Sequence, residues 1–389
     1  MLDVVAGAPT RMTASLHSGV ENASIVGAVE ATRLAREVRG IGRYVRAILP
    51  RLVAQRPELR IVLFVKKQGH VSTVTQMFAE NPVLRDRIEV RPVREMPRFD
   101  ADVFWYPWNV ASPLPSRGAV VVTMHDVAPL AFPDPRFLKW RKNFRWRRRY
   151  ASAALNADII IADSAFTADE VNRYLSVPHE RMRVVLLAAD DLSVPAADND
   201  SAALARLGVQ RPFVLAVGAA DRRKNLGLVE RAMQRVVEEH PAATLVLAGP
   251  REDKIEPGIE APWRKTLGFV SEDELVTLYR TAEALVMSST YEGFGLPVLE
   301  AMSFGTPVIC ARASSLPEVG GDAAEWVEPD DDAQAARAIS RLLSDPGVKA
   351  SMRAASLVQA ARFSWDQTAR QTLAAFDDAI AITRRSRQG

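Results

Sequence analysis

The 389-residue chain contains 48% hydrophobic and 25% charged residues and has a formal net charge of +3, a balance typical of globular proteins with two or three domains. This composition excludes a disordered, collagen-like or disulfide-stapled protein, and the lone Cys310 cannot form an internal disulfide. No apolar run approaches the roughly 18 residues needed to cross a bilayer. Residues 1–24 lack the features of a signal peptide, so we expect an irregular extension there and a cytoplasmic location.

The first half of the chain alternates β-branched runs with helical patterns. The predicted strands are residues 25–30, 61–65, 103–105, 119–124, 158–162 and 183–187. A helix is predicted over residues 42–55, where apolar side chains such as Ile48 and Leu52 recur at helical spacing. Strands that alternate with helices indicate a parallel sheet covered on both faces.

A polar stretch rich in Asp, Asn, Ser and Pro begins near residue 190 and is predicted to be a linker. The alternation then resumes, with predicted strands at residues 213–217, 244–247, 266–269, 284–287, 307–310 and 325–327. We therefore predict two doubly wound α/β domains, residues 25–195 and 196–362, with ligands bound in the cleft between them. Residues 363–389 are predicted to form a helix with Ser364 as its N-cap, which can pack back on the N-terminal domain.

The most informative segment, residues 291–302 (YEGFGLPVLEAM), follows one predicted strand and precedes another. Pro297 suits the first turn of a helix and Gly305 its end, which predicts a helix over residues 297–304. Gly293 and Gly295 let the backbone approach a ligand, and the helix start can bind a phosphate. A plain strand-to-helix turn is the alternative interpretation.

Glu292 and Glu300 enclose seven residues, and residues 291–309 (YEGFGLPVLEAMSFGTPVI) resemble the E-x7-E segment of retaining glycosyltransferases of family GT4 nearly residue for residue. The likeness extends over about residues 25 to 385, through the segments RGIGRY at 39–44, MHDV at 124–127, RKNL at 223–226 and ASSLPEV at 313–319. It implies the two-domain GT-B fold, with an N-terminal acceptor-binding domain and a C-terminal nucleotide-sugar-binding domain.

The resemblance also implies roles for individual donor-side residues. Glu292 would bind hydroxyl groups of the donor sugar, and Glu300 those of the nucleotide ribose. The sugar and diphosphate would meet backbone N–H groups around Gly293, Phe294, Gly295 and Leu296.

Arg223 and Lys224 follow a predicted strand, where cations can neutralise a leaving diphosphate. The alternative is a solvated pair of cations, and in the family the arginine can be partly structural.

On the acceptor side, Gly40 and Gly42 lie between a predicted strand and a predicted helix. This order can bring backbone N–H groups toward a phosphate, although a plain tight turn would look the same. The resemblance implies a loop at the cleft near the donor's phosphate.

His125 and Asp126 follow the predicted strand at 119–124. The resemblance implies that His125 contacts the donor sugar or the reaction centre, while Asp126 either orients its imidazole or supports the loop. A lone histidine is more often structural, which is the alternative. No cluster has metal-ligand spacing, so we expect neither a metal nor a cofactor besides the donor substrate.

Residues 136–149 (RFLKWRKNFRWRRR) hold eight basic residues and no acidic one, while the rest of the chain is slightly acidic. The interleaved aromatic side chains are Phe137, Trp140, Phe144, Trp146 and, just beyond, Tyr150. Two interpretations stay open: a helix on an anionic membrane surface, or a core-facing aromatic stripe with a solvated basic face. Nucleic-acid binding is disfavoured because the basic character belongs to a single segment.

The sequence therefore predicts a retaining glycosyltransferase that moves a hexose from a nucleotide-diphosphate sugar to a saccharide or lipid-linked saccharide during polysaccharide or lipopolysaccharide synthesis. GDP-mannose is the preferred donor by analogy with mannosyltransferases of surface polysaccharides, and UDP-glucose is the alternative. A nucleotide-sugar epimerase of the same architecture is the runner-up, and a non-catalytic sugar-nucleotide-binding module is disfavoured. Residues 136–149 could hold the enzyme on the inner membrane face.

Overall fold

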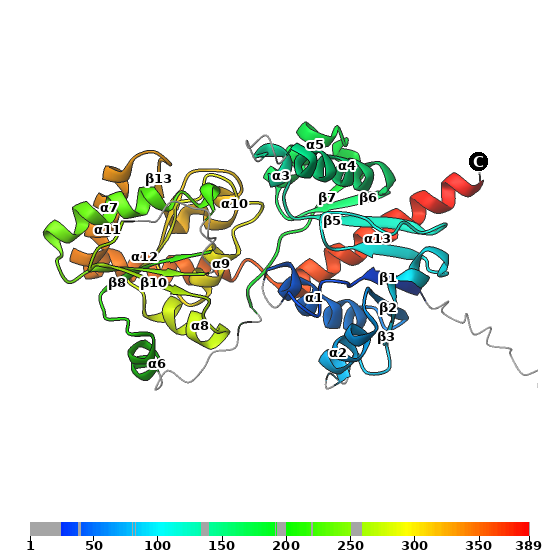
Figure 1. Ribbon diagram of the computed structural model, residues 1–389, viewed down its shortest axis with the longest axis horizontal. Helices are drawn as coiled ribbons and strands as arrows, with labels where there is room; N and C mark the ends of the chain where they lie inside the picture. Colours follow the sequence, from blue (N-terminus) through cyan, green and yellow to red (C-terminus); the bar gives the residue numbers. More distant parts are fainter. Residues whose placement is uncertain are drawn as a thin grey trace, which may run out of the picture.

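The structure is a computed structural model that describes residues 25–37, 40–79, 81, 83–133, 140–190, 192, 200–218, 221–249 and 259–388. It shows two parallel α/β units (Figure 1), which confirms the predicted fold class. The predicted extension at residues 1–24 and the start of the basic segment, residues 136–139, lie outside the described residues.

The N-terminal unit is a seven-stranded sheet in the order β3-β2-β1-β4-β5-β6-β7. Its strands are β1 (Ile25–Glu30), β2 (Leu59–Val65), β3 (Ile88–Pro92), β4 (Val103–Tyr106), β5 (Ala119–Met124), β6 (Ile159–Ala162) and β7 (Met182–Val184). Its helices are α1 (Ile41–Gln55), α2 (Gln68–Ala79), α3 (Ala128–Ala131), α4 (Trp140–Asn156) and α5 (Ala165–Leu175). Buried residues of α1 and α2 pack on one face of the sheet, and those of α4 and α5 pack on the other.

The C-terminal unit is a six-stranded sheet in the order β10-β9-β8-β11-β12-β13. Its strands are β8 (Phe213–Val217), β9 (Thr244–Ala248), β10 (Arg264–Gly268), β11 (Ala284–Met287), β12 (Val308–Ala311) and β13 (Ala324–Val327). Its helices are α6 (Asp200–Leu207), α7 (Leu226–Glu239), α8 (Glu272–Thr281), α9 (Leu296–Ser303), α10 (Leu316–Gly320), α11 (Asp332–Ser344) and α12 (Pro346–Ala360). In both sheets the strand order reverses beside the first strand, and ligands of such sheets bind at the carboxyl ends of the strands near this point.

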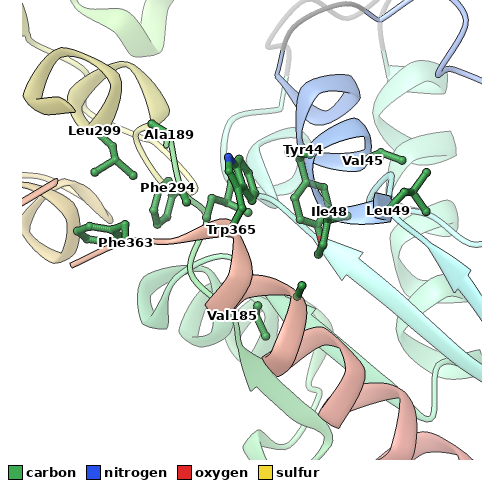
Figure 2. Packing of buried hydrophobic residues seen from close by; sticks show 14 of the residues in the cluster. Tyr44, Val45, Ile48, Leu49, Val185, Ala189, Phe294, Leu299, Phe363 and Trp365 are labelled. Atoms are coloured by element: carbon green, nitrogen blue, oxygen red, sulfur yellow. The ribbon is translucent and has the colours of Figure 1, made fainter. Parts of the chain in front are cut away.

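Helix α13 (Trp365–Gln388) crosses from the C-terminal unit and packs against α1, β5 and β6 of the N-terminal sheet (Figure 1). Ser364 Oγ accepts a hydrogen bond from the Asp366 amide, as expected of an N-cap. Figure 2 shows Trp365 between the side chains of Phe294 and Tyr44, which come from different units. Trp365 is fully buried, and its ring centroid lies 6.0 Å from that of Tyr44. One apolar cluster thus joins the two units at the point where α13 begins.

Most predicted strands agree with the structure to within two residues at each end, but one strand was missed and one was predicted too long. The sequence pattern misses β3, an edge strand, because Glu89 and Arg91 interrupt its partly buried apolar positions. The strand predicted at 183–187 is wrong in its second half, since β7 ends at Val184. The apolar run continues because Val185 and Leu187 are buried in the core rather than paired in the sheet.

Candidate active site

The predicted donor-side and acceptor-side residues follow the carboxyl ends of strands in the two sheets. Lys224 comes after β8 and Glu292 after β11, whereas His125 comes directly after β5. The loops meet: a Cβ atom on Gly293 would lie 1.7 Å from the carbonyl oxygen of His125. A residue without a side chain is therefore required at Gly293 for the two units to approach this closely.

Glu292 and Lys224 form an ion pair, with 2.6 Å between Lys224 Nζ and Glu292 Oε1. The two side chains are 17% and 15% exposed, so the pair is accessible but largely shielded from water. Each partner is anchored through its backbone: the Glu292 amide donates to Ser314 Oγ, and Ser288 Oγ donates to the Lys224 carbonyl. The arrangement presents a carboxylate and an ammonium group side by side, ready for a ligand with hydroxyl and phosphate groups.

Arg223 does not join this pair. Its guanidinium donates to Asp221, at 2.9 Å between Nη2 and Oδ2. Burial alone would lower the pKa of Arg223, but Asp221, and beyond it Asp126 and Glu292, outweigh burial and raise it. The Arg223 guanidinium is thus held by the nearby Asp221 carboxylate, and it still interacts electrostatically with Glu292. This arrangement agrees with an arginine whose role is partly structural.

The Glu300 side chain, on α9, has hydrogen-bond partners different from those of Glu292. Its Oε1 accepts from Arg43 Nη1 at 2.5 Å, and its Oε2 accepts from the Tyr279 hydroxyl at 2.7 Å. Arg43 belongs to α1 of the N-terminal unit and Tyr279 to α8 of the C-terminal unit. The structure therefore separates the two glutamates of the motif into two polar clusters.

The loop between the glutamates leads into α9, which begins at Leu296, one residue before the predicted start. Gly295 occupies the N-cap position with φ 112°, and no side chain caps this end of the helix. The Ser315 hydroxyl lies 2.9 Å from the Glu292 carbonyl oxygen and 2.8 Å from the Phe294 carbonyl oxygen, and as a hydrogen-bond donor to them it holds the loop backbone in place. The Phe294 side chain is buried, so this residue can offer a ligand only its backbone.

The two acceptor-side glycines differ in position: Gly40 lies before α1, as expected, whereas Gly42 lies inside the first turn of α1. Gly40 has φ 58° and is the N-cap of α1. A Cβ atom on Gly42 would lie 1.8 Å from the Glu37 carbonyl oxygen, so only glycine fits in this turn. Contact of this loop with a donor phosphate stays a prediction.

His125 is held on both sides of its ring. Its Nδ1 lies 2.5 Å from Asp163 Oδ2, and its Nε2 lies 3.0 Å from the Pro107 carbonyl oxygen. Burial alone would lower the pKa of His125, but the Asp163 carboxylate and the Pro107 carbonyl more than offset it and raise the pKa above its ordinary value. Two acceptors facing the two ring nitrogens favour the doubly protonated imidazolium.

The prediction that Asp126 might orient this imidazole is wrong, because Asp163 does so. Asp126 Oδ1 instead accepts from the Ala128 amide at 3.0 Å and supports the loop, which was the other expectation. Asp163 follows β6, the strand next to β5, so its side chain reaches His125 across the sheet edge.

Residues 163–167 form a clasp between the two units. Ser164 Oγ and Thr167 Oγ1 both donate to the Gly293 carbonyl, at 2.6 and 2.9 Å. The Glu318 carboxylate accepts from the amides of Ala165 and Phe166 at the start of α5. The segment that holds His125 therefore also holds the residue next to Glu292.

The basic segment is helical from Trp140 onward, within α4. Its exposed cations are Arg141, Lys142, Arg145, Arg147, Arg148 and Arg149. Tyr150 is buried and Trp146 packs against the core, whereas the Phe144 side chain is 53% exposed. The described part of the segment thus fits the second interpretation, a core-facing aromatic edge with a solvated basic face, except for the exposed Phe144. Binding to a membrane surface stays a prediction.

Two family models cover most of the chain. Residues 38–191 match the model for glycosyltransferase family 4, and residues 203–362 match that for glycosyl transferases group 1. O-antigen chain mannosyltransferase B of Escherichia coli is 31% identical over 267 residues, which are 66% of this chain and 69% of that protein. The chain belongs to glycosyltransferase family 4.

This family-4 glycosyltransferase also matches longer proteins. The serotype-specific mannosyltransferase WbdA of Escherichia coli is 28% identical over 278 residues, 66% of this chain but only 33% of that protein. Among solved structures, HepE from Anabaena in complex with UDP-glucose has a TM-score of 0.68 at 18% identity, covering 93% of this chain and 99% of that one. Sucrose-phosphate synthase from Thermosynechococcus elongatus has a TM-score of 0.67 at 19% identity, covering 92% and 100%. These likenesses confirm the GT-B fold.

The sequence interpretation gave no role to several polar residues of this candidate site: Arg43, Asp163, Tyr279, Ser315 and Glu318. Asp163 carried a signal, since an acidic residue directly after a buried strand lies at the sheet edge where ligands bind. Arg43 lies in the RGIGRY segment, but nothing there pointed to its pairing with Glu300, which is 257 positions away, and Tyr279, 21 positions before Glu300, carried no signal. Among the described residues, no group of three His, Cys, Asp or Glu side chains could hold a metal ion. No helix in the described part is long and apolar enough to cross a membrane.

Proposed function

We propose that this glycosyltransferase transfers a hexose, with retention of anomeric configuration, from a nucleotide-diphosphate sugar to a saccharide or lipid-linked saccharide in polysaccharide or lipopolysaccharide synthesis. Mannose from GDP-mannose is the specific donor proposed. Two relatives named as mannosyltransferases support this choice, one of them an O-antigen chain enzyme. The solved HepE complex with UDP-glucose keeps a uridine donor as the alternative.

The ion pair between Glu292 and Lys224 is the observation that carries the proposal. A donor sugar would present hydroxyl groups to the Glu292 carboxylate, and its diphosphate would present anionic oxygens to Lys224 Nζ. Lys224 would exchange a carboxylate for the diphosphate, and Glu292 would exchange the ammonium group for hydroxyl groups that donate hydrogen bonds to it, so neither is left buried and without a partner. The uncapped start of α9 lies within the same loop and adds a positive electrostatic potential for the diphosphate.

The proposed reaction needs no covalent intermediate. The acceptor hydroxyl oxygen forms a bond to the anomeric carbon while the bond from that carbon to the diphosphate oxygen breaks. The proton of the attacking hydroxyl passes to the departing diphosphate. Lys224 and the α9 start would stabilise the charge that develops on the leaving group, which is where such interactions accelerate reactions most. His125 would contact the donor sugar beside Gly293; because both of its ring nitrogens face protein acceptors, such a contact would require Nε2 to exchange the Pro107 carbonyl for a sugar hydroxyl.

The test is transfer itself, with a matched pair of variants. The full chain is incubated with GDP-mannose, UDP-glucose or ADP-glucose, with and without saccharide acceptors, and release of nucleoside diphosphate is measured. Glu292→Gln is compared with Glu283→Gln, because Glu283 also pairs with a lysine, Lys349, but precedes β11 instead of following it. We expect activity to be lost in the first and kept in the second. A sugar altered without any acceptor would instead indicate an epimerase.

We further propose that the basic face of α4 holds the enzyme on the anionic inner surface of a membrane, near a lipid-linked acceptor. The exposed cations support this proposal, and Phe144 is an exposed aromatic side chain, in the part of the segment that the structure describes, that could enter the headgroup region. Because Trp146 and Tyr150 pack inward, the attraction would be mainly electrostatic.

A further inference from the structure

The carboxylate of Glu300 is shared between the two units of the protein. Tyr279 supplies one hydrogen bond from within the C-terminal unit, whereas Arg43 supplies the other from the N-terminal unit. The side chains of Arg43 and Glu300 are only 10% and 12% exposed. A charge pair so well shielded from water is costly to leave half made.

Tyr279 is held in place by residues of its own C-terminal unit. The Tyr279 ring is fully buried and stacks on Phe304, with 6.3 Å between centroids and an interplanar angle of 11°. Its carbonyl oxygen accepts from Thr306 Oγ1 at 2.6 Å. Tyr279 therefore gives Glu300 one preset anchor inside the C-terminal unit.

The arginine side depends on where α1 lies. Arg43 is in the first turn of α1, directly after Gly42, which fits tightly against the Glu37 carbonyl. The next residue, Tyr44, is buried with its ring packed edge-on against those of Trp105 and His125. The backbone at Arg43 is thus fixed, and its planar guanidinium can orient a carboxylate better than a flexible ammonium group could.

We propose that Arg43 sets the selectivity for the ribose hydroxyls of the donor by orienting the Glu300 carboxylate. The inference rests on the proposed function, in which Glu300 binds the ribose. A carboxylate has about four acceptor sites, and the two hydrogen bonds in the structure leave others for a diol. With Arg43 in place, the carboxylate plane is fixed from two sides and these sites point in constant directions. Arg43 is a positioning residue, and through it the N-terminal unit contributes to recognition of the ribose of the nucleotide.

A ribose-specific titration tests this role. The full chain is titrated with GDP and UDP and with their 2′-deoxy and 3′-deoxy forms, and the ratio of dissociation constants is recorded for each pair. A site built to bind a hydroxyl rejects the analogue that lacks it. We expect the wild type to prefer the ribose form at least about tenfold. In Arg43→Met the ratio should fall to about one, and Arg43→Lys should give an intermediate value.

Arg51 provides the matched control. It lies two turns further along α1 and also pairs across to another element, with 3.1 Å between its Nε and Asp366 Oδ1 on α13. Arg51→Met should keep the full ribose ratio. Tyr279→Phe removes the other anchor and should lower the ratio as well, which keeps the test decisive if Arg43→Met folds poorly.

The possible results distinguish failure of the role of Arg43 from failure of the proposed function. Weaker binding of both nucleotide forms by Arg43→Met, with the ratio unchanged, would overturn the selectivity role and leave Arg43 as a contact between the units. A wild type that binds the ribose and deoxyribose forms equally would overturn this inference together with the Glu300 assignment. A wild type that binds none of these nucleotides would overturn the proposed function itself.

Discussion

The two glutamates of the E-x7-E motif differ in which part of the molecule holds them. Glu292 pairs with Lys224, and both follow strands of the C-terminal sheet, so this ion pair lies within one unit. Glu300 pairs with Arg43, which comes from the N-terminal unit. The pairing within the proposed sugar and diphosphate end therefore uses one unit alone, whereas the pairing within the proposed ribose end needs a residue from each unit.

The clasp at residues 163–167 extends this contrast. Asp163 holds the His125 ring, while Ser164 and Thr167 hold the carbonyl of Gly293, the neighbour of Glu292. The proposed sugar and diphosphate end is thus brought to the acceptor side by a short segment that touches both. Changes at the motif should affect catalysis or binding according to which end they disturb.

The largest expected effect is the loss of turnover in Glu292→Gln. The carboxylate lies at the proposed reacting sugar, so turnover should fall roughly 100-fold or more while nucleotide affinity changes little. Glu300→Gln should do the reverse, weakening nucleotide binding with a smaller effect on turnover. Steady-state kinetics and calorimetric titration measure both quantities, and equal, mild effects in the two variants would contradict the separation of roles.

A second large effect is expected at Lys224. A hydrogen bond to a charged group contributes about 1.5–3 kcal/mol, so Lys224→Met should weaken GDP or UDP binding roughly 10- to 100-fold. Binding of the nucleoside without phosphates should be unchanged. Lys349→Met is the control, because Lys349 pairs with Glu283 before β11 and away from the loop. Unchanged diphosphate affinity in Lys224→Met would place the phosphate site elsewhere.

A moderate, pH-dependent effect is expected for Asp163→Asn. The raised pKa of His125 means that the stabilisation by its charged form is fully present below its ordinary value of 6.5 and is lost as the pH rises through the folded-state pKa. The free energy of unfolding should therefore be higher for the wild type than for Asp163→Asn at mildly acidic pH. This difference should shrink as the pH rises toward alkaline values. Chemical denaturation at several pH values measures this. Asp126→Asn, which disturbs a loop hydrogen bond and removes the smallest contribution to the raised pKa of His125, should show a difference from the wild type that depends much less on pH.

Much of the fold could be predicted because buried strands are short, nearly continuous apolar runs, as in β5 and β11. The same pattern fails for β3, whose charged positions reflect its place at the sheet edge. The motif around Glu292 could be recognised because its residues are neighbours along the chain. The pairing of Arg43 with Glu300 could not, since the two residues are 257 positions apart and meet only through the packing of two units.

The smallest expected effect on catalysis belongs to the basic face of α4. The orientation of its aromatic residues depends on how α4 packs on the sheet, so composition alone could not distinguish the buried Tyr150 from the exposed Phe144.

Changing Arg141, Lys142, Arg145 and Arg147 to Ser should leave transfer to a soluble acceptor unchanged, because both ends of the motif lie on other elements. Sedimentation with liposomes that contain anionic lipid should show binding by the wild type and none by this variant. Salt should weaken the wild-type binding, since the Debye length is only about 8 Å at physiological ionic strength. A wild type that ignores anionic liposomes at low salt would show that this face of α4 is a solvated surface only.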